Sequence, residues 1–373
     1  MRVIISGGGT GGHIFPAVAI ANVIKLHEKD SEILFVGAEG RMEMQKIPQV
    51  GYKIVGLNIA GFQRKQLWKN FSLPFKMLAS SLKARKIIKD FAADIVIGVG
   101  GYASWATLKQ AQKLSIPTLL QEQNSLAGKS NQMLSKRATK ICVAYDNMEK
   151  YFPKNKIVFT GNPVRKNIAQ IAENTDELRK QAFEEFNLNP TKKTVLVTGG
   201  SLGARTINQS IEYSLQYFID NEIQLIWQTG KFYYSGIMDR TKTLFENNAK
   251  AKELIRIHEF IFGMDKVYSI ADIIISRAGA LSISELCLVG KPTILVPSPN
   301  VAEDHQTKNA MALVEKNAAI MIKDSELQNE FVKTLDSIIN DEQKMLMLGT
   351  NILSLGIKDA DEKIYEQIKK IIG

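Results

Sequence analysis

Residues 2–13 have the sequence RVIISGGGTGGH, and residues 194–204 have the sequence TVLVTGGSLGA. In both stretches a short β-branched run leads into a glycine-rich segment, and a helical spacing of apolar residues follows. A buried strand, a glycine loop and a helix in that order are typical of the start of a parallel α/β unit. Because this pattern opens each half of the chain, the sequence predicts an α/β protein with two doubly wound domains.

The rest of the chain continues the alternation. Apolar strands separated by helical segments are typical of a parallel sheet covered on both faces. The predicted strands are Arg2–Ser6, Ile33–Val36, Asp94–Val99, Thr118–Leu120, Lys140–Val143 and Ile157–Phe159, and then Thr194–Thr198, Gln224–Gln228, Glu253–His258, Asp272–Ser276 and Thr293–Val296. The predicted helices include Pro16–Leu26, Lys76–Phe91, Ala103–Leu114, Asp176–Phe186 with Thr175 as its N-cap, and one that starts at Ala204.

We expect one domain over residues 1–163 and a second over residues 164–373, meeting near Gly161–Arg165 with a ligand cleft between them. The last helical stretch, Asp361–Ile372, could pack on either domain, and the sequence leaves both arrangements open.

Composition narrows the class of protein. The 373 residues are 45% hydrophobic and 23% charged, which excludes disordered, collagen-like and coiled-coil chains. The two cysteines, Cys142 and Cys287, are too far apart for a zinc ribbon and too few for a disulfide scaffold, so we expect a reducing compartment. The first residues lack the unbroken apolar core of a signal peptide, and Ile95–Leu108 is too short and glycine-rich to span a bilayer. A soluble, cytoplasmic chain is the expectation.

Charge is distributed unevenly between the two halves. The chain has 48 Lys+Arg and 38 Asp+Glu, and residues 1–165 contain 24 of these basic residues but only 10 of the acidic ones. The first half is therefore strongly basic and the second mildly acidic, which indicates that the first half meets an anionic surface or ligand.

Residues 62–91 account for much of this asymmetry, because basic and aromatic side chains are interleaved there. Such a pattern suits contact with anionic lipid headgroups, while nucleic-acid binding and an ordinary solvated helix remain alternatives. The residues predicted to contact the membrane are Arg64, Lys65, Trp68, Lys69, Phe75, Lys76, Lys83, Arg85 and Lys86, and Lys89 extends the basic run.

The glycine loop at residues 7–12 formally matches the dinucleotide pattern GxGxxG, but so glycine-rich a run matches many patterns. It lacks the Lys and the hydroxyl residue of a nucleoside triphosphatase loop, because His13 and Ile14 stand there. Backbone amides at the start of a helix can bind a phosphate or a reacting hydroxyl. His13 could accept a proton at this point, or it could merely cap or pack the helix.

Further polar loops follow other predicted strands. Gly100-Gly101-Tyr102 and Gln121–Asn124 lie where the sheet of the first domain should bind a ligand, although turn chemistry alone could explain them. In the second half, Ser282 and Glu285 fit a capping box, and the same turn could instead bind a phosphate while Glu285 binds a ribose. No clustering of ligand residue types predicts a metal site.

Several motifs occur in order along the chain and together resemble the MurG family of peptidoglycan glycosyltransferases. They are Gly8–His13, Gly100–Tyr102, Glu122–Asn124, Gly161–Arg165, Gly199–Ser201 with Gly203-Ala204, and Arg277 to Glu285. The similarity runs over about residues 1–315, and the Leu202 position and the Asn300–His305 loop depart from the family pattern. The resemblance implies a GT-B fold, two Rossmann-like domains facing a cleft. It also implies transfer of N-acetylglucosamine from its UDP conjugate to undecaprenyl-diphospho-N-acetylmuramoyl-pentapeptide.

The resemblance also implies roles for individual residues. Ser201 and the Ala280–Ser282 turn would bind the diphosphate, and Ile283 and Ser284 would belong to the same substrate-binding stretch. Arg165 and Ile261 would contact the nucleotide, and Glu285 would bind the ribose. Gln306 and Asn124 would contact the sugar, Thr10, Gly11 and Gly12 would lie near it, and His13 would be the general base. No cofactor or metal is implied. The basic domain would dock peripherally on the cytoplasmic face of the plasma membrane, with no nucleic-acid partner.

The sequence leaves four alternative functions open. A relative that uses another lipid acceptor such as diacylglycerol, and a UDP-sugar epimerase, would share the donor domain. An NAD-dependent oxidoreductase built on residues 7–12, with Glu39 at the ribose, would lack a hydride-transfer site. A non-catalytic membrane-binding module would leave the second glycine loop unexplained.

Overall fold

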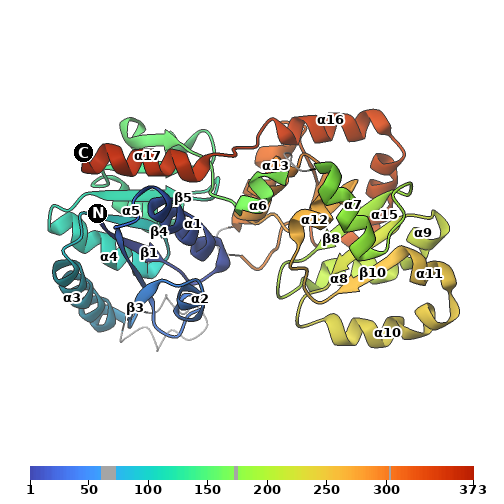
Figure 1. The fold of residues 1–373 in the computed structure, drawn as a ribbon, viewed down its shortest axis with the longest axis horizontal. Helices are drawn as coiled ribbons and strands as arrows, with labels where there is room; N and C mark the ends of the chain where they lie inside the picture. Colours follow the sequence, from blue (N-terminus) through green and yellow to red (C-terminus); the bar gives the residue numbers. More distant parts are fainter. Residues whose placement is uncertain (60–72, 172–174, 302–303) are drawn as a thin grey trace. The chain divides into compact units, whose positions relative to one another are not determined.

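The chain folds into two compact α/β units (Figure 1). The computed structural model describes residues 1–59, 73–171, 175–301 and 304–373, without the side chains of residues 73–76 and 175. Unit 1 comprises Met1–Val164 together with Asp359–Gly373, and unit 2 comprises Arg165–Lys358.

Within the described residues, unit 1 is built on a seven-stranded parallel sheet with the order β3-β2-β1-β4-β5-β6-β7. The strands are β1 Arg2–Gly7, β2 Glu32–Ala38, β3 Lys53–Leu57, β4 Ile95–Gly100, β5 Thr118–Glu122, β6 Lys140–Val143 and β7 Ile157–Phe159. The helices are α1 Gly11–His27, α2 Glu43–Gln49, α3 Leu73–Phe91, α4 Tyr102–Lys113, α5 Lys129–Ser135 and α17 Ala360–Ile372. The strand order reverses between β1 and β4, where doubly wound sheets bind ligands.

Unit 2 repeats this plan. Its described part contains a six-stranded parallel sheet with the order β10-β9-β8-β11-β12-β13. The strands are β8 Thr194–Thr198, β9 Gln224–Gln228, β10 Ile255–His258, β11 Ile273–Ser276, β12 Thr293–Leu295 and β13 Ile320–Met321. The helices are α6 Lys166–Ala169, α7 Thr175–Phe186, α8 Arg205–Tyr213, α9 Leu215–Asp220, α10 Tyr234–Asn247, α11 Ala249–Leu254, α12 Met264–Ile270, α13 Ala280–Val289, α14 His305–Val314, α15 Leu327–Ile339 and α16 Glu342–Leu353.

The central strands are buried along their whole length, as expected for sheets with helices on both faces. In unit 1, one hydrophobic cluster joins the sheet to α3, α4 and α5, and a second joins it to α1 and α17. Helix α17 lies beside α1 (Figure 1). Tyr365 on α17 stacks on His27 of α1, with ring centroids 4.5 Å apart. Tyr365 and Lys369 both donate hydrogen bonds to Glu28, at 3.0 Å and 2.8 Å. The last helix thus belongs to unit 1.

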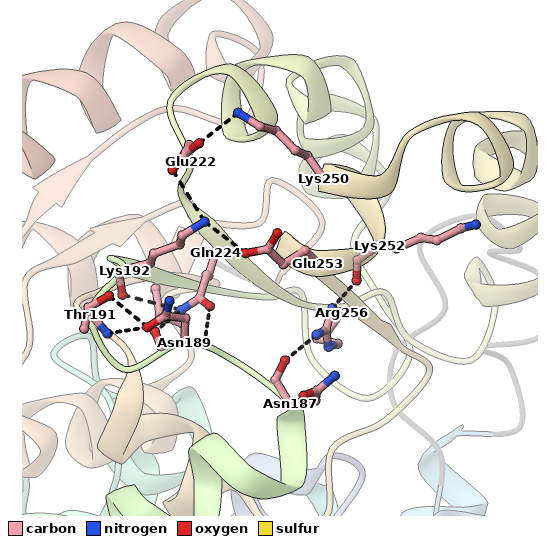
Figure 2. A network of polar contacts seen from close by, with 11 residues as sticks. Asn187, Asn189, Thr191, Lys192, Glu222, Gln224, Lys250, Lys252, Glu253 and Arg256 are labelled. Carbon is pink, nitrogen blue, oxygen red and sulfur yellow. Dashed lines mark hydrogen bonds and ion pairs between the residues drawn. The ribbon is translucent and has the colours of Figure 1, made fainter.

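The amino ends of β8, β9 and β10 in unit 2 carry a network of polar contacts (Figure 2). Lys192 precedes β8 and pairs with Glu222 and Glu253, which precede β9 and β10. Gln224 at the start of β9 bonds the backbone of Asn189 in both directions, at 2.6 Å and 2.9 Å. Because these polar groups bind one another at the amino ends of the strands, we expect the ligand site at the opposite edge of the sheet, where the strands have their carboxyl ends.

Each predicted strand is found, with bounds that differ by at most two residues, but several details of the prediction were wrong. Glu253 lies in α11 and not in a strand, α1 begins at Gly11 and not at Pro16, and Thr175 is the first residue of α7 rather than its N-cap. The strands β3 and β13 and the helices α2, α5, α6, α14, α15 and α16 were not predicted. The two strands and the helices α2, α5 and α6 are short, and their apolar periodicity extends over too few residues to be recognised.

Candidate active site

Two glycine loops of unit 1 meet at the point where the strand order reverses. Gly8 and Gly9 follow β1, and Gly100 and Gly101 follow β4. Gly9, Gly100 and Gly101 have φ angles of 88°, 104° and 92°, in the left-handed region that favours glycine. A Cβ atom at Gly101 would lie 3.0 Å from the carbonyl oxygen of Gly8, so the loops approach each other closely because neither carries a side chain there.

His13 lies in the first turn of α1, between these loops. Its Nδ1 atom is 2.9 Å from the carbonyl oxygen of Gly8 and 3.4 Å from Oγ1 of Thr10. A Cβ atom at Gly100 would be only 2.8 Å from Nε2 of His13. Because a carbonyl oxygen can only accept, Nδ1 carries the proton in neutral His13 and Nε2 carries the lone pair. His13 is therefore oriented as a proton acceptor through Nε2.

The first turn of α1 also supplies backbone donors. Thr10 is the N-cap, with extended φ and ψ angles, and its side chain makes no capping hydrogen bond. The N–H groups of Gly11 and Gly12 lie in the first turn, where helix carbonyls cannot reach them. Thr10, Gly11, Gly12 and His13, four of the predicted site residues, are thus brought together at one helix N-terminus.

The loop after β5 is organised by a buried carboxylate. Glu122 is 1% exposed and accepts hydrogen bonds from the backbone of Asn124 at 3.1 Å and of Gly128 at 3.0 Å. The side-chain amides of Asn124 and Asn131 donate to the same carboxylate at 3.3 Å and 2.9 Å. Glu122 thus fixes the orientation of Asn124, the residue predicted to contact the sugar.

In unit 2 the glycine loop after β8 is held against the neighbouring loop after β9. A Cβ atom at Gly203, where φ is 86°, would lie 2.2 Å from the carbonyl oxygen of Thr229. The backbone N–H of Lys231 donates to the carbonyl of Ser201 at 3.2 Å. Ser201 itself is exposed at the tip of this loop, before α8.

The predicted capping box at Ser282 and Glu285 is wrong. Helix α13 begins at Ala280 with Gly279 as its N-cap, so Ser282 lies inside the first turn and Glu285 lies beyond it. The N–H groups of Ala280, Leu281 and Ser282 belong to that first turn, while the N–H of Ile283 already bonds the carbonyl of Gly279.

Two further predicted residues also lie on α13, where each has a packing role. Ile283 is buried in the core of unit 2, and the hydroxyl of Ser284 donates to the carbonyl of Ala280 at 3.1 Å.

Glu285 is paired with Arg165. The guanidinium donates from Nε and from Nη2 to the two carboxylate oxygens, each at 2.7 Å. Glu285 is 8% exposed, whereas solvent reaches the side chain of Arg165. Burial alone would lower the pKa of Arg165, but the hydrogen bonds and charge of Glu285 raise it above its ordinary value. Burial, followed by the nearby charge of Glu285, raises the pKa of the Tyr268 phenol.

Two other predicted residues are held by hydrogen bonds. The N–H of Ile261 donates to Oε1 of Gln228 at 2.9 Å, and the side chain of Gln228 donates to Thr198 at 3.1 Å. This ties the segment after β10 to the end of β8. Oε1 of Gln306, on α14, accepts from the N–H of Ser298 at 2.9 Å.

Two residues that support the site were missed. Glu43 on α2 binds the N–H of Gly9 at 2.8 Å, and nothing in the local sequence signals a contact across 34 residues. Arg277 donates to the carbonyls of Val296 and Pro297 and pairs with Asp324, which also accepts from Thr206. The only feature of the sequence that points to Arg277 is its position two residues before Gly279 in the Arg277-x-Gly279 motif.

The basic segment of unit 1 is described only in part. Arg64, Lys65, Trp68 and Lys69 lie outside the described residues, and so do the side chains of Phe75 and Lys76. On the described part of α3, Lys83 pairs with Glu39 at 3.0 Å, and Arg85 and Lys86 are exposed. Leu78 and Leu82, one turn apart, are 62% and 61% exposed. An apolar and basic face is thus open to solvent.

The described residues contain neither a group of side chains that could hold a metal ion nor a helix that could span a membrane. Across residues 1–59, 73–171, 175–301 and 304–373, no three His, Cys, Asp or Glu side chains form a group that could hold a metal ion. In the same ranges, no helix is long and apolar enough to cross a membrane.

The chain has two parallel-sheet α/β units, and each has a glycine loop and a helix N-terminus where the strand order reverses. This is the arrangement of the GT-B class of glycosyltransferase folds. Residues 3–143 match the glycosyltransferase family 28 N-terminal domain, and residues 194–364 match the glycosyltransferase family 28 C-terminal domain. The chain belongs to glycosyltransferase family 28.

Relatives and solved structures agree with this assignment. Two relatives are named UDP-N-acetylglucosamine--N-acetylmuramyl-(pentapeptide) pyrophosphoryl-undecaprenol N-acetylglucosamine transferase. The one from Bacteroides fragilis is 53% identical over 372 residues, covering 100% of this chain and 96% of the relative. The one from Flavobacterium psychrophilum is 49% identical over 371 residues, covering 100% and 98%.

The crystal structure of Acinetobacter baumannii MurG has a TM-score of 0.78 and 27% identity, with 99% of each chain covered. A UDP-GlcNAc 2-epimerase from Neisseria meningitidis has a TM-score of 0.64 and 17% identity, with 99% of this chain and 100% of the epimerase covered. The likeness to the epimerase extends to the fold alone.

Proposed function

We propose that this chain transfers N-acetylglucosamine from UDP-N-acetylglucosamine to the 4-hydroxyl of undecaprenyl-diphospho-N-acetylmuramoyl-pentapeptide, with inversion at the anomeric carbon. The observation that carries the proposal is 53% identity over the whole chain to a relative named for this transfer. The product is the lipid-linked disaccharide precursor of peptidoglycan.

Unit 2 is the donor-binding unit in this proposal. The first turn of α13 and the Ser201 loop provide backbone donors and a hydroxyl for the diphosphate. Ile261 and Arg165 contact the nucleotide, Glu285 accepts hydrogen bonds from the ribose hydroxyls, and Gln306 contacts the sugar. As UDP leaves, the charge on its diphosphate is stabilised by the amide groups at these helix N-termini. No step of the proposed reaction requires a metal ion.

Unit 1 is the acceptor-binding unit. Nε2 of His13 takes the proton of the acceptor 4-hydroxyl, and the hydroxyl oxygen forms the new bond to the anomeric carbon while the bond to UDP breaks. The tautomer set by the carbonyl of Gly8 supports this role for His13. Thr10, Gly11, Gly12 and Asn124 contact the sugars.

The test of the proposal is transfer of labelled N-acetylglucosamine to the lipid-linked muramoyl-pentapeptide. We expect release of one UDP for each disaccharide formed, and release that depends on the acceptor. Conversion of the donor into an epimeric UDP-sugar, without acceptor and without net release of UDP, would indicate an epimerase. Transfer to diacylglycerol alone would indicate a different lipid acceptor. Either result would overturn the proposal.

We also propose that unit 1 docks on the cytoplasmic face of the membrane through α3, as a peripheral protein. The exposed Leu78 and Leu82 suit shallow insertion, and Arg85, Lys86 and Lys89 suit anionic headgroups. Each such cation contributes about 1 kcal/mol near an anionic surface. Changing Arg85, Lys86 and Lys89 to Glu is therefore expected to weaken binding to vesicles containing anionic lipid by about 100-fold or more.

A matched control reverses three exposed lysines of unit 2, Lys180, Lys242 and Lys333, and so changes the net charge equally. Sedimentation with vesicles of increasing anionic lipid content measures both variants. Equal loss in the two variants would mean that net charge and not the α3 face controls binding. Unchanged binding in the α3 variant would leave α3 as an ordinary solvated helix.

A further inference from the structure

A carboxylate lies buried under the glycine loop of unit 1. Glu43, the first residue of α2, is 1% exposed. Its Oε2 atom accepts the N–H of Gly9 at 2.8 Å, and its Oε1 atom accepts the N–H of Ala38 at 3.0 Å. In the described part of the chain it has no ion-pair partner, so these two backbone groups are what compensates its burial.

The backbone around Glu43 leaves room for this side chain. A Cβ atom at Gly8 would lie 2.2 Å from the Glu43 carboxylate, and one at Gly37 would lie 2.6 Å from its Cγ atom. Side chains at these two positions would displace Glu43. The loop after β1 and the end of β2 are therefore shaped around the carboxylate.

One peptide group connects Glu43 to His13. Glu43 accepts a hydrogen bond from the N–H of Gly9, and the carbonyl oxygen of Gly8 lies 2.9 Å from Nδ1 of His13. This N–H and this carbonyl belong to the same planar peptide group. A negative charge at the N–H end of a peptide polarises it and increases the electron density on its oxygen. That oxygen then binds the Nδ1–H of His13 more strongly.

We propose that Glu43 is a positioning residue that acts on His13 through the Gly8–Gly9 peptide. It holds His13 in the tautomer with the lone pair on Nε2, and it stabilises the positive charge that His13 gains when it takes the acceptor proton. A carboxylate that orients a histidine directly does the same in other acid–base sites, and here a peptide lies between the two groups. The inference rests on the proposed role of His13 as the base.

The first test is the kinetics of Glu43→Gln. A glutamine can accept one of the two backbone N–H groups, but its amide nitrogen then faces the other donor. We expect kcat to fall about 10- to 100-fold, the usual effect of losing the partner that orients a functional histidine. The dissociation constant for UDP-N-acetylglucosamine should change little, because the nucleotide and diphosphate of the donor are assigned to unit 2. In a His13→Ala background, Glu43→Gln should lower kcat by less than about twofold, because groups that act as one unit are not additive.

The second test reads the tautomer of His13 without catalysis. In protein labelled with ¹⁵N-histidine, the neutral wild-type ring should show a protonated Nδ1 and an unprotonated Nε2, and Glu43→Gln should shift both resonances toward a mixture. The matched control is Asp94→Asn, which removes a carboxylate that accepts the backbone N–H of Arg2 at 2.7 Å at the opposite edge of the same sheet. It should change neither kcat nor the His13 resonances. If Glu43→Gln does not fold, Glu43→Asp takes its place, because it keeps the charge but shortens the reach.

The outcomes separate this inference from the proposed function. Loss of kcat with unchanged His13 resonances, or equal losses in the wild-type and His13→Ala backgrounds, would reduce Glu43 to a structural residue. Unchanged kcat in folded Glu43→Gln would also overturn the inference. Near-full turnover of His13→Ala would remove His13 as the base, and the absence of any transfer by the wild type would overturn the proposed function.

Discussion

Replacing His13 with alanine is expected to lower kcat by about 100- to 10,000-fold, the range that general-base groups contribute. The reason is that Nδ1 of His13 is held by the carbonyl of Gly8, so Nε2 is the atom oriented to take a proton. The affinity for UDP-N-acetylglucosamine, measured by titration calorimetry, should change little, because the nucleotide and diphosphate of the donor are assigned to unit 2. Single-turnover transfer to the lipid-linked acceptor measures the chemical step directly.

The control is His27→Ala, a histidine at the other end of the same helix. His27 bonds Glu362 at 2.8 Å and stacks on Tyr365, so its loss should weaken the packing of α17 without changing kcat. If His13→Ala retained most of the wild-type single-turnover rate, the base would have to be another group, and the orientation of His13 would serve the loop alone.

Much of the fold was predictable because its signals are local. The first strands of the two units, β1 and β8, are rich in β-branched residues, and a glycine loop follows each of them. The seven-residue α2 lacks such a signal, and so does β3, whose register with β2 depends on pairing across the sheet. Helix α17 was predicted as a helix, but only the contacts of Tyr365 and Lys369 with Glu28 assign it to unit 1.

In the candidate site, too, the sequence predicts local patterns but not contacts between residues that are distant in the chain. Ser282 and Glu285 have the spacing of a capping box, a local pattern, yet Glu285 binds Arg165, which is 120 residues away in the sequence. Glu43 supports its loop through a contact with Gly9, 34 residues away in the sequence. Arg277 does so through a contact with Asp324, 47 residues away. Sequence patterns identify the helix N-termini because glycine is needed there. They do not identify buried side chains whose partners are set only by the tertiary fold.

Replacing Glu285 with alanine is expected to raise the KM for UDP-N-acetylglucosamine by about 10- to 100-fold. A hydrogen bond to a charged group contributes about 1.5–3 kcal/mol, and about 1.4 kcal/mol corresponds to a tenfold change in affinity. The change removes the proposed acceptor of the ribose hydroxyls and leaves the guanidinium of Arg165 without its carboxylate. Because solvent reaches the Arg165 side chain, the free energy of unfolding should fall by only about 1 kcal/mol.

The chain offers a closely matched control for this pair. Arg240 donates to the two oxygens of Glu212 at 2.6 Å and 2.8 Å, which repeats the two-bond geometry of Arg165 and Glu285 between α8 and α10 of the same unit. Glu212→Ala should therefore change the stability of unit 2 about as much as Glu285→Ala does, but leave the KM unaltered. Equal KM values in the two variants would show that Glu285 serves only to hold Arg165, and the ribose would then need another acceptor. A rise in KM confined to Glu285→Ala, with kcat at saturating donor little changed, would locate the effect in donor binding rather than in the proton transfer assigned to His13.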